Sequence, residues 1–356
     1  MKHVILGGGN IGTLLLAEIA HNGNKPVLYT QDKSKWSDII DVYDSKNNFF
    51  YSVNSYSVTN SLVQAVSNAD IIWITYPAAM FPMISKQLLP IVEPGQVLII
   101  IPGAGGAEFA FQDIVYKGCA LIGFERVHSI ARLRKYGSSV TELGRKNELS
   151  IASIPTSNAA AIAPYLEELF DMPCRTFGNY LNVTLVPSNQ ILHTTRLYSM
   201  FANNSAADIY ERNFYFYREW DDASSEIMLA CDQELQKVCQ ALNRLDLSGV
   251  RSLRDHYESY SISSMTRKIA SIPAFSDILT PMMKSETGWV LDFSSRYFKS
   301  DFSYGLKIIK DIAELASVSV NHINAVWDWY TKISNDTDYF LFGNMSLEEF
   351  YEIYQQ

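Results

Sequence analysis

Short apolar runs of strand length alternate with segments of helical spacing through the first half of the chain. The strand-length runs lie at residues 3–6, 26–30, 70–76, 97–101 and 119–123. The run 70–76 is almost continuously apolar, which is typical of a parallel strand covered on both faces. Together with helical segments at 61–67 and through Leu89, this pattern predicts a doubly wound α/β sheet.

Further elements are predicted before residue 180. The runs 140–143 and 149–153 flank a polar turn, and we expect them to pair as neighbouring strands. Residues 156–158 offer N-cap candidates for a helix that reaches Phe170. A last strand is expected at 174–177, where the α/β half would end.

The pattern changes to long helical stretches from residue 186 onwards. Candidate helices lie at residues 191–202, 218–242, 248–259, 305–316, 320–332 and 346–354. Aromatic clusters such as 214–217 are interpreted as helix packing, because no cationic surface accompanies them. We therefore place a domain boundary near Leu185, and predict an α/β domain over residues 1–185 and an all-helical (all-α) domain over residues 186–356.

The first dozen residues carry the most specific motif of the α/β half. Gly7, Gly9 and Gly12 follow the run 3–6 and precede an apolar helical run, 13–20. In a strand–turn–helix unit of this spacing, the first glycine makes the turn, the second leaves room for a pyrophosphate and the third lets the helix pack closely. The motif predicts a Rossmann-type dinucleotide-binding domain, with a purely structural turn as the alternative.

Other segments of the α/β half are expected to complete this dinucleotide site. The amides of Asn10 and Ile11, at the positive end of the first helix, would face the phosphates. Pro77 begins the loop 77–81 after a buried strand, and ligands of open α/β sheets bind at the carboxyl ends of strands. The small-residue turn 102–107 lies at the same edge. It is either a flexible connection or a close approach of the backbone to the nicotinamide.

The end of the second predicted strand bears on the choice of cofactor. An NAD site usually has a carboxylate there, which accepts hydrogen bonds from the adenine ribose and repels the extra phosphate of NADP. Here Thr30 and Gln31 are neutral, and Asp32 comes one place late. Lys33 and Lys35 follow. The sequence therefore favours NADP slightly over NAD.

A polar stretch after the predicted strand 119–123 suggests the rim of an active site. It extends from Phe124 to Arg132. Within it we predict Glu125 and Arg132 as substrate-binding residues. For His128, an ordinary surface or hydrogen-bonded histidine is the preferred interpretation.

Composition narrows the classes of partner. The chain of 356 residues is 47% hydrophobic, enough to bury two cores, and its net charge of −9 without a basic block argues against a nucleic-acid partner. Its four cysteines form no CxxC pair and are expected to be reduced, with no metal site. No apolar run reaches the length of a membrane span, and a strand begins at once, so we expect a cytoplasmic protein without a signal peptide.

Two segments of the helical half carry groups suited to catalysis. His193 stands near the opening of the first helix after the boundary, in the run 187–197. Arg296 and Asp301 lie in the run 295–306, which is expected to break helix just before Gly305. Taken singly, each residue also allows a structural interpretation, as a capping histidine, a surface arginine or a helix-capping aspartate.

At these residues the chain resembles the opine dehydrogenase family, of the octopine and nopaline dehydrogenase type, whose members join a Rossmann domain to an all-helical domain. The matching segments are the amino-terminal glycines, 102–109, 125–132, 189–193, and Arg296-Tyr297 with Asp301 and Tyr304-Gly305-Leu306. The resemblance implies that His193 is the catalytic histidine and Asp301 its acidic partner. It also implies that Arg296 holds the carboxylate of an oxo acid.

The resemblance further implies the reductive condensation of an amino acid with a 2-oxo acid such as pyruvate, dependent on NADH or NADPH. Hydride from the reduced nicotinamide would convert the intermediate imine to a secondary amine. A histidine oriented by a carboxylate can exchange the required protons near neutral pH. The expected site is the cleft between the domains, with the imidazole and the carboxylate meeting across it. The amino acid, the oxo acid and the oligomeric state, a homodimer included, stay open.

Four positions depart from the family pattern. Thr194 and Ser303 stand where proline is usual, and both replacements are expected to be tolerated. Phe81 stands where a histidine is often found, and Gln31 replaces the usual cofactor acid. The last two bear on the choice of substrate and cofactor.

Two other functions fit the same plan of domains. A 2-oxo acid, 2-hydroxy acid or ketopantoate-type reductase would use one carbonyl substrate and no amine. A catalytically silent dinucleotide-sensing protein would have no use for His193, Arg296 and Asp301 together, and their joint presence counts against it.

Overall fold

The computed structural model describes all residues from Met1 to Gln356, and the chain divides into two compact units. Unit 1 comprises Met1–Thr184 and Glu352–Gln356, and unit 2 comprises Leu185–Tyr351. Residues 352–356, expected with the helical half, thus belong to unit 1. They are held there because the Thr156 amide donates a hydrogen bond of 3.0 Å to the Gln356 carbonyl.

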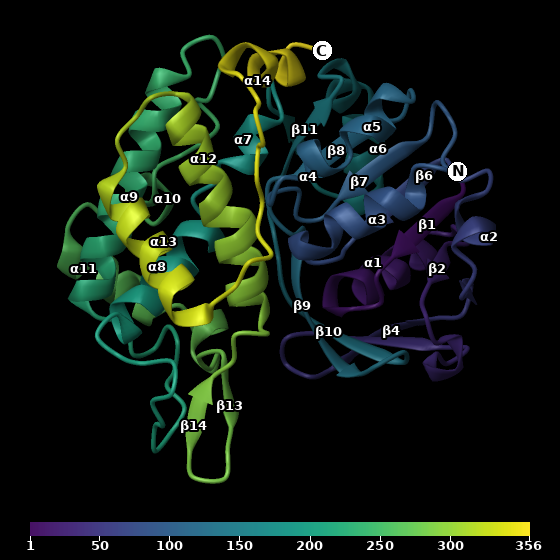
Figure 1. Cartoon of the computed structure of the whole chain (residues 1–356). Helices are drawn as coiled ribbons and strands as arrows, with labels where there is room; N and C mark the ends of the chain where they lie inside the picture. Colours follow the sequence, from purple (N-terminus) through teal and green to yellow (C-terminus); the bar gives the residue numbers. More distant parts are fainter. The chain divides into compact units, whose positions relative to one another are not determined.

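Unit 1 is an α/β domain built around an eight-stranded sheet (Figure 1). In spatial order the strands are β12 (Cys174–Thr176), β11 (Leu149–Ile154), β8 (Ala120–Phe124), β7 (Val97–Ile100), β6 (Ile71–Ile74), β1 (His3–Leu6), β2 (Val27–Tyr29) and β5 (Ser57–Thr59). All neighbours run parallel except β8 and β11, which are antiparallel. Strands β1 and β6 are buried along their whole length, as their continuous apolar sequences predict.

Helices connect these strands and cover the sheet (Figure 1). They are α1 (Asn10–His21), α2 (Leu62–Val66), α3 (Phe81–Leu88), α4 (Ala107–Ala110), α5 (Gln112–Tyr116), α6 (Ser157–Phe170) and α7 (Leu181–Thr184), with the 3-10 turns η1 (Lys33–Lys35) and η2 (Ala78–Met80). Trp73, Phe124 and Phe170 pack edge to face in the core, with ring centroids 6.0 to 6.3 Å apart.

A second, four-stranded sheet packs against α1. Its order is β4 (Phe49–Val53), β3 (Ile40–Tyr43), β10 (Ser139–Arg145) and β9 (Ser129–Lys135). The expected pairing of 140–143 with 149–153 is therefore wrong, because β10 pairs with β3 and β9 whereas β11 pairs with β8 and β12. Strand β11 is buried on both faces and so belongs inside the main sheet, whereas much of β10 is only half-buried.

Unit 2 is mainly helical. Its helices are α8 (Asn189–Phe201), α9 (Asp222–Ala241), α10 (Leu253–His256), α11 (Ile262–Ala270), α12 (Lys307–Leu315), α13 (Asn321–Ser334) and the first part of α14 (Leu347–Tyr354), with a 3-10 turn, η3 (Pro273–Phe275), and a π-helix, η4 (Tyr297–Leu306). The predicted fold class, a Rossmann-type α/β sheet followed by a helical domain, is confirmed.

One part of unit 2 is not helical, contrary to the prediction of an all-helical domain. Strands β13 (Met282–Lys284) and β14 (Trp289–Leu291) form an antiparallel hairpin that projects from the helices (Figure 1). The turn needs Gly288, because a Cβ there would lie 2.5 Å from the Tyr210 carbonyl oxygen. The Trp289 amide also donates to that carbonyl, 2.8 Å away.

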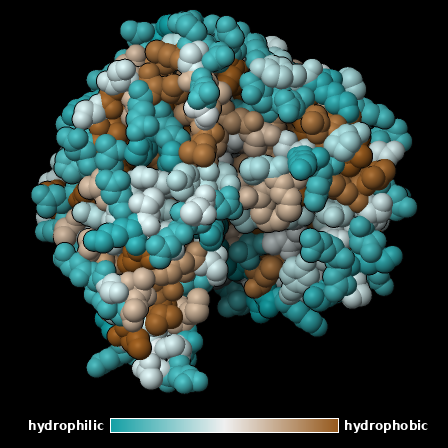
Figure 2. All heavy atoms as spheres, in the orientation of Figure 1, coloured by the Kyte–Doolittle hydropathy of each residue, from teal (hydrophilic) through white to brown (hydrophobic).

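The helices of both units are too short or too polar to cross a membrane. The face drawn in Figure 2 is largely hydrophilic, and its hydrophobic residues form separate patches.

The packing of α1 on the turn before it predicts opposite outcomes for two glycines. A Cβ on Gly12 would lie 1.7 Å from the Gly7 carbonyl oxygen, whereas a Cβ on Gly9 would have no atom within 4 Å. We expect Gly12→Ala to lower the free energy of unfolding by about 3 kcal/mol or more, because backbone must move to admit the methyl group. Gly9→Ala should lower it by less than about 1 kcal/mol. Urea denaturation of the two variants checks this, and equal losses would contradict the packing.

Candidate functional site

The turn between β1 and α1 has the geometry that its glycines predict. Gly7 has a φ of +110°, in the left-handed region that favours glycine. The Thr75 hydroxyl lies 3.2 and 3.0 Å from the carbonyl oxygens of Leu6 and Gly7 and holds the turn in place. Gly9 is the N-cap of α1 and has open space where a side chain would be. The first amides of α1 therefore have room for an anionic group.

The side chains of Asn10 and Ile11 make structural contacts. The Asn10 side-chain oxygen accepts a hydrogen bond of 2.9 Å from the Leu133 amide, which ties α1 to β9. Ile11 packs against the apolar core of unit 1. Both residues lie in the first turn of α1, where their backbone amides have no partner within the helix.

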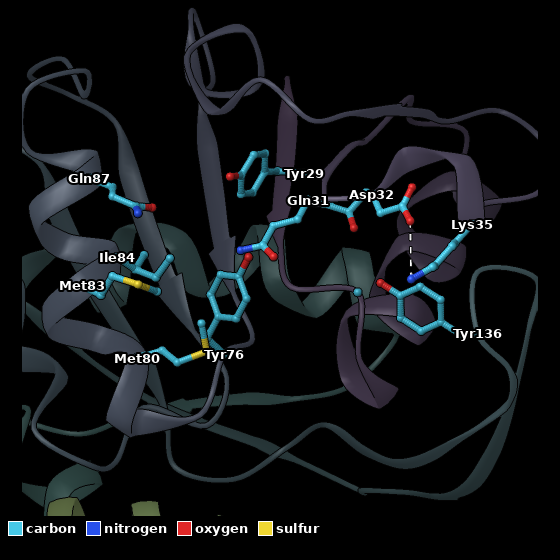
Figure 3. A pocket seen from close by; sticks show the side chains of 12 residues that line it. Tyr29, Gln31, Asp32, Lys35, Tyr76, Met80, Met83, Ile84, Gln87 and Tyr136 are labelled. Carbon is cyan, nitrogen blue, oxygen red and sulfur yellow. Dashed lines mark ion pairs between the residues drawn. The ribbon is translucent and has the colours of Figure 1, made fainter. Parts of the chain in front are cut away.

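A cleft of about 640 Å³ opens at the carboxyl ends of β2 and β6 (Figure 3). It is lined by Gly8, Tyr29, Thr30, Gln31, Asp32, Lys35, Tyr76, Met80, Met83, Ile84, Gln87 and Tyr136. Figure 3 shows the Gln31 side chain between Tyr29 and Tyr76. Of the predicted cofactor residues, Thr30 and Gln31 line this cleft and Pro77 does not. Its size suits a part of a dinucleotide.

The acidic group nearest the end of β2 is already engaged. One oxygen of Asp32 accepts hydrogen bonds from the Ser34 amide, 3.1 Å, and hydroxyl, 2.6 Å, and the other pairs with Lys35 at 3.4 Å (Figure 3). The bond from the Ser34 hydroxyl is the main cause that lowers the pKa of this exposed carboxylate. The Asp32 carboxylate is therefore held by Ser34 and Lys35, whereas the Gln31 side chain next to it at the strand end carries no charge.

The predicted rim residues Glu125 and Arg132 do not meet. Glu125 follows β8 and pairs with Arg126 at 3.5 Å, whereas Arg132 is exposed on β9. Their role in substrate binding stays a prediction. His128 is fully buried, with its Nε2 2.6 Å from a carboxylate oxygen of Glu18, and so is a hydrogen-bonded core histidine, as preferred from the sequence.

Unit 2 brings His193 and Asp301 into direct contact. His193 lies in α8 and Asp301 in η4, and the His193 Nδ1 is 2.7 Å from the Asp301 Oδ2. The side chains are only 4% and 10% exposed. Arg296 immediately precedes η4. All three residues belong to unit 2, so the expectation that the imidazole and the carboxylate meet across a gap between domains is wrong.

The close approach of η4 to α8 explains this contact. A Cβ on Gly305 would lie 2.7 Å from the Gln190 Cβ of α8, so only glycine fits at this crossing. The expected helix break before Gly305 is wrong, because the chain continues from η4 directly into α12. The π-helix is rare in proteins, and where it occurs it often lies at a functional site.

The positions where the resemblance expects proline or histidine have local partners. The Thr194 hydroxyl donates to the Gln190 carbonyl, 2.6 Å, and the Ser303 hydroxyl lies 2.8 Å from the Tyr330 hydroxyl. Both replacements are thus accommodated inside their helices. Phe81 is buried against Phe111, with ring centroids 5.7 Å apart, and belongs to the core of unit 1.

Burial dominates the electrostatics of His193. Removal from water lowers the pKa of its imidazole, the hydrogen bond and charge of Asp301 oppose this, and the positive charge of Arg296 adds to it. The Tyr297 ring covers the imidazole, with centroids 4.3 Å apart, and the Arg296 guanidinium carbon lies 5.7 Å from the Tyr297 centroid. The site therefore combines a base that is neutral at rest with a carboxylate that can stabilise its charged form.

Tyr217 is a member of this site that the sequence did not reveal. Its hydroxyl lies 2.7 Å from the His193 Nε2, and both side chains are buried. The sequence showed Tyr217 only within an aromatic cluster, interpreted as packing. It lies in the irregular segment between α8 and α9, where no local spacing relates it to His193.

Comparison with known proteins identifies both halves of the chain. Residues 176–334 match the model of the alpha-helical domain of NAD/NADP octopine/nopaline dehydrogenases. Residues 2–131 match the N-terminus of NAD-dependent glycerol-3-phosphate dehydrogenases.

Relatives align over nearly their full length. The tauropine dehydrogenase of Arabella iricolor is 25% identical, with 92% of this chain and 90% of the relative covered. The octopine dehydrogenase of Mizuhopecten yessoensis is 22% identical, with 92% and 89% covered. A solved structure of octopine dehydrogenase with NADH and pyruvate shares the fold, with a TM-score of 0.79 and 21% identity over 94% of this chain and 89% of that one. The helical half of the chain thus matches the octopine and nopaline dehydrogenase family, and the chain as a whole is similar to opine dehydrogenases, which are NAD(P)-dependent oxidoreductases.

Proposed function

We propose that this protein is an opine dehydrogenase that joins an amino acid to a 2-oxo acid, such as pyruvate, and reduces the product to an N-(carboxyalkyl) amino acid. The observation that carries the proposal is the buried contact of 2.7 Å between His193 and Asp301, in the unit that matches the octopine/nopaline dehydrogenase model. The relatives named tauropine and octopine dehydrogenase support the same classes of substrate.

Unit 1 suits a dinucleotide in both shape and donors. The first amides of α1, beside the open space at Gly9, would hold the pyrophosphate, and the cleft around Gln31 would hold the adenosine end. When bound, the reduced nicotinamide supplies the hydride. We propose NADP as the preferred cofactor, because Gln31 is neutral and Lys35, which pairs with Asp32, supplies a positive charge at the cleft.

The residues of unit 2 would transfer the protons of the reaction and bind the carboxylate of the oxo acid. Asp301 accepts the Nδ1 proton of His193, which leaves Nε2 as the accepting nitrogen, and stabilises the imidazolium when it forms. A neutral His193 can take the proton that the amino group must lose before it attacks the carbonyl. Arg296 would bind the oxo-acid carboxylate with its planar fork and orient the carbonyl.

A matrix of amino acids against 2-oxo acids tests the reaction class. We expect oxidation of NADPH, followed by its absorbance, only in wells that contain both substrates, and a lower KM for NADPH than for NADH. Oxidation with an oxo acid alone would instead identify a simple 2-oxo acid or ketopantoate-type reductase. No oxidation in any well, with nucleotide still bound, would favour a dinucleotide sensor.

Loss of the acid–base pair should affect turnover and not cofactor binding. We expect His193→Ala and Asp301→Asn each to lower kcat about 10²- to 10⁴-fold, the usual contribution of general acid–base catalysis. The acid limb of kcat/KM in the wild type should lie below pH 6.5, because the pKa of His193 is lowered and the neutral form is the base. It should move lower still in Asp301→Asn, where the carboxylate charge is missing. Exposed His256→Gln is the matched control, and an unchanged kcat for either site variant would contradict the assignment.

Removal of the Arg296 side chain should weaken the binding of one substrate. We expect Arg296→Ala to raise the KM for the oxo acid about 10- to 100-fold, the range for a lost charge-assisted pair, with little change in the KM for the amino acid. Steady-state kinetics with each substrate varied in turn measures this. Arg267→Ala, an exposed arginine of α11, is the control. An unchanged KM for the oxo acid would remove Arg296 from the site.

A further inference from the structure

Both ring nitrogens of His193 are occupied in this structure. The Nδ1 contacts Asp301 at 2.7 Å, and the Nε2 contacts the Tyr217 hydroxyl at 2.7 Å. The Tyr297 ring lies over the imidazole at a tilt of 33°, and the Phe216 ring meets it edge-on with centroids 5.6 Å apart. While these contacts hold, no nitrogen of the imidazole can touch a substrate directly.

The backbone around Tyr217 is clamped from the helix that carries His193. The buried Arg196 lies one turn after His193 on α8, and its Nε donates to the Phe216 carbonyl at 3.1 Å. Its Nη2 donates to the Glu219 carbonyl at 2.6 Å. The two bonds hold the chain on both sides of Tyr217 at a set distance from the imidazole.

The ring of Tyr217 is also fixed. It stacks on Phe275, with centroids 4.5 Å apart and planes 26° apart, and lies parallel to Trp220 with centroids 6.2 Å apart. The held backbone and the stacked ring together fix the Tyr217 hydroxyl beside the His193 Nε2.

The protonation states of His193 and Tyr217 follow from the hydrogen bonds that the two side chains make. Burial is the main cause that raises the pKa of Tyr217 well above its usual range, so its hydroxyl keeps its proton. Since His193 donates its Nδ1 proton to Asp301, the Tyr217 hydroxyl donates to the bare Nε2. The Tyr217 oxygen keeps lone pairs that can accept a further hydrogen bond.

We propose that Tyr217 is the proton relay between the amino substrate and the pair of His193 and Asp301. The ammonium N–H bond of the substrate breaks and its proton goes to the Tyr217 oxygen, while the Tyr217 hydroxyl proton goes to the His193 Nε2. Tyr217 ends neutral, and His193 ends as an imidazolium beside Asp301. The reverse transfer protonates the hydroxyl of the carbinolamine, which leaves as water. This inference rests on the proposed function and gives Tyr217 the contact with the reacting nitrogen.

Tyr217→Phe tests the relay because it keeps the stacked ring and removes only the hydroxyl. We expect kcat to fall about 10²-fold or more, with the KM for NADPH unchanged. The thermal midpoint should fall by only a few degrees, because the buried Nε2 loses its hydrogen-bond partner while the ring packing is kept. Tyr198→Phe, on the same helix as His193 and packed on Trp329, should keep the wild-type kcat. A Tyr217→Phe variant with kcat within about threefold of the wild type, or with a higher kcat, would overturn the relay.

A measurement without turnover separates this inference from the proposed function. In ¹⁵N spectra of the imidazoles, the signal missing from His193→Gln identifies His193. We expect its Nε2 resonance to shift in Tyr217→Phe and not in Tyr198→Phe, and its titration to move to lower pH, because the imidazolium loses a charge-assisted hydrogen bond. An unchanged resonance would overturn the hydrogen-bonded chain. Wild-type protein without activity on any substrate pair would refute the proposed function and the relay together, whereas activity that survives in Tyr217→Phe would refute the relay alone.

Discussion

The buried imidazole of His193 has a hydrogen-bond partner at each nitrogen, and the elements around it in unit 2 are arranged to supply both partners. A polar group buried without a partner costs free energy, and at His193 Asp301 and Tyr217 offset this cost at the two nitrogens. Each partner comes from a different part of the chain. Gly305 brings η4 close enough to α8 for Asp301 to reach, and Arg196 holds the segment that carries Tyr217. The close contact of α8 with η4 and the hydrogen bonds of Arg196 thus both position the hydrogen-bonded chain of Asp301, His193 and Tyr217.

Unit 1 depends on a comparable buried group. The Glu108 Oε1 accepts hydrogen bonds from the hydroxyls of Thr184 and Tyr354, while its Oε2 is buried without a partner. Burial raises the pKa of this carboxyl to about 7. Thr184 is the last residue of unit 1 before the chain enters unit 2, and Tyr354 follows its return. Glu108 directly follows the turn 102–107. Its carboxyl therefore contacts both the residue at which the chain leaves unit 1 and a residue just after the chain returns to it.

The two units divide the proposed chemistry between them. The open space at Gly9 and the cleft around Gln31 are suited to hold a nucleotide, and the buried pair in unit 2 is suited to move protons. The residue at the end of β2, Gln31, is neutral, and the Asp32 carboxylate beside it is paired with Lys35. In the proposed function, cofactor preference and proton transfer thus depend on residues of different units.

Much of this organisation could be predicted from the sequence, because it depends on local spacing. The glycines at 7, 9 and 12, the continuous apolar strands and the change to helical periodicity after residue 185 each report a local geometry, and His193, Arg296 and Asp301 stood out through the family resemblance. The tertiary structure decided what depends on distant segments. It placed β10 and β11 in different sheets, formed the hairpin β13–β14, made a π-helix of 297–306 and set Tyr217 against His193. These outcomes follow from contacts between residues far apart in the chain, and periodicity within a short window carries no information about them.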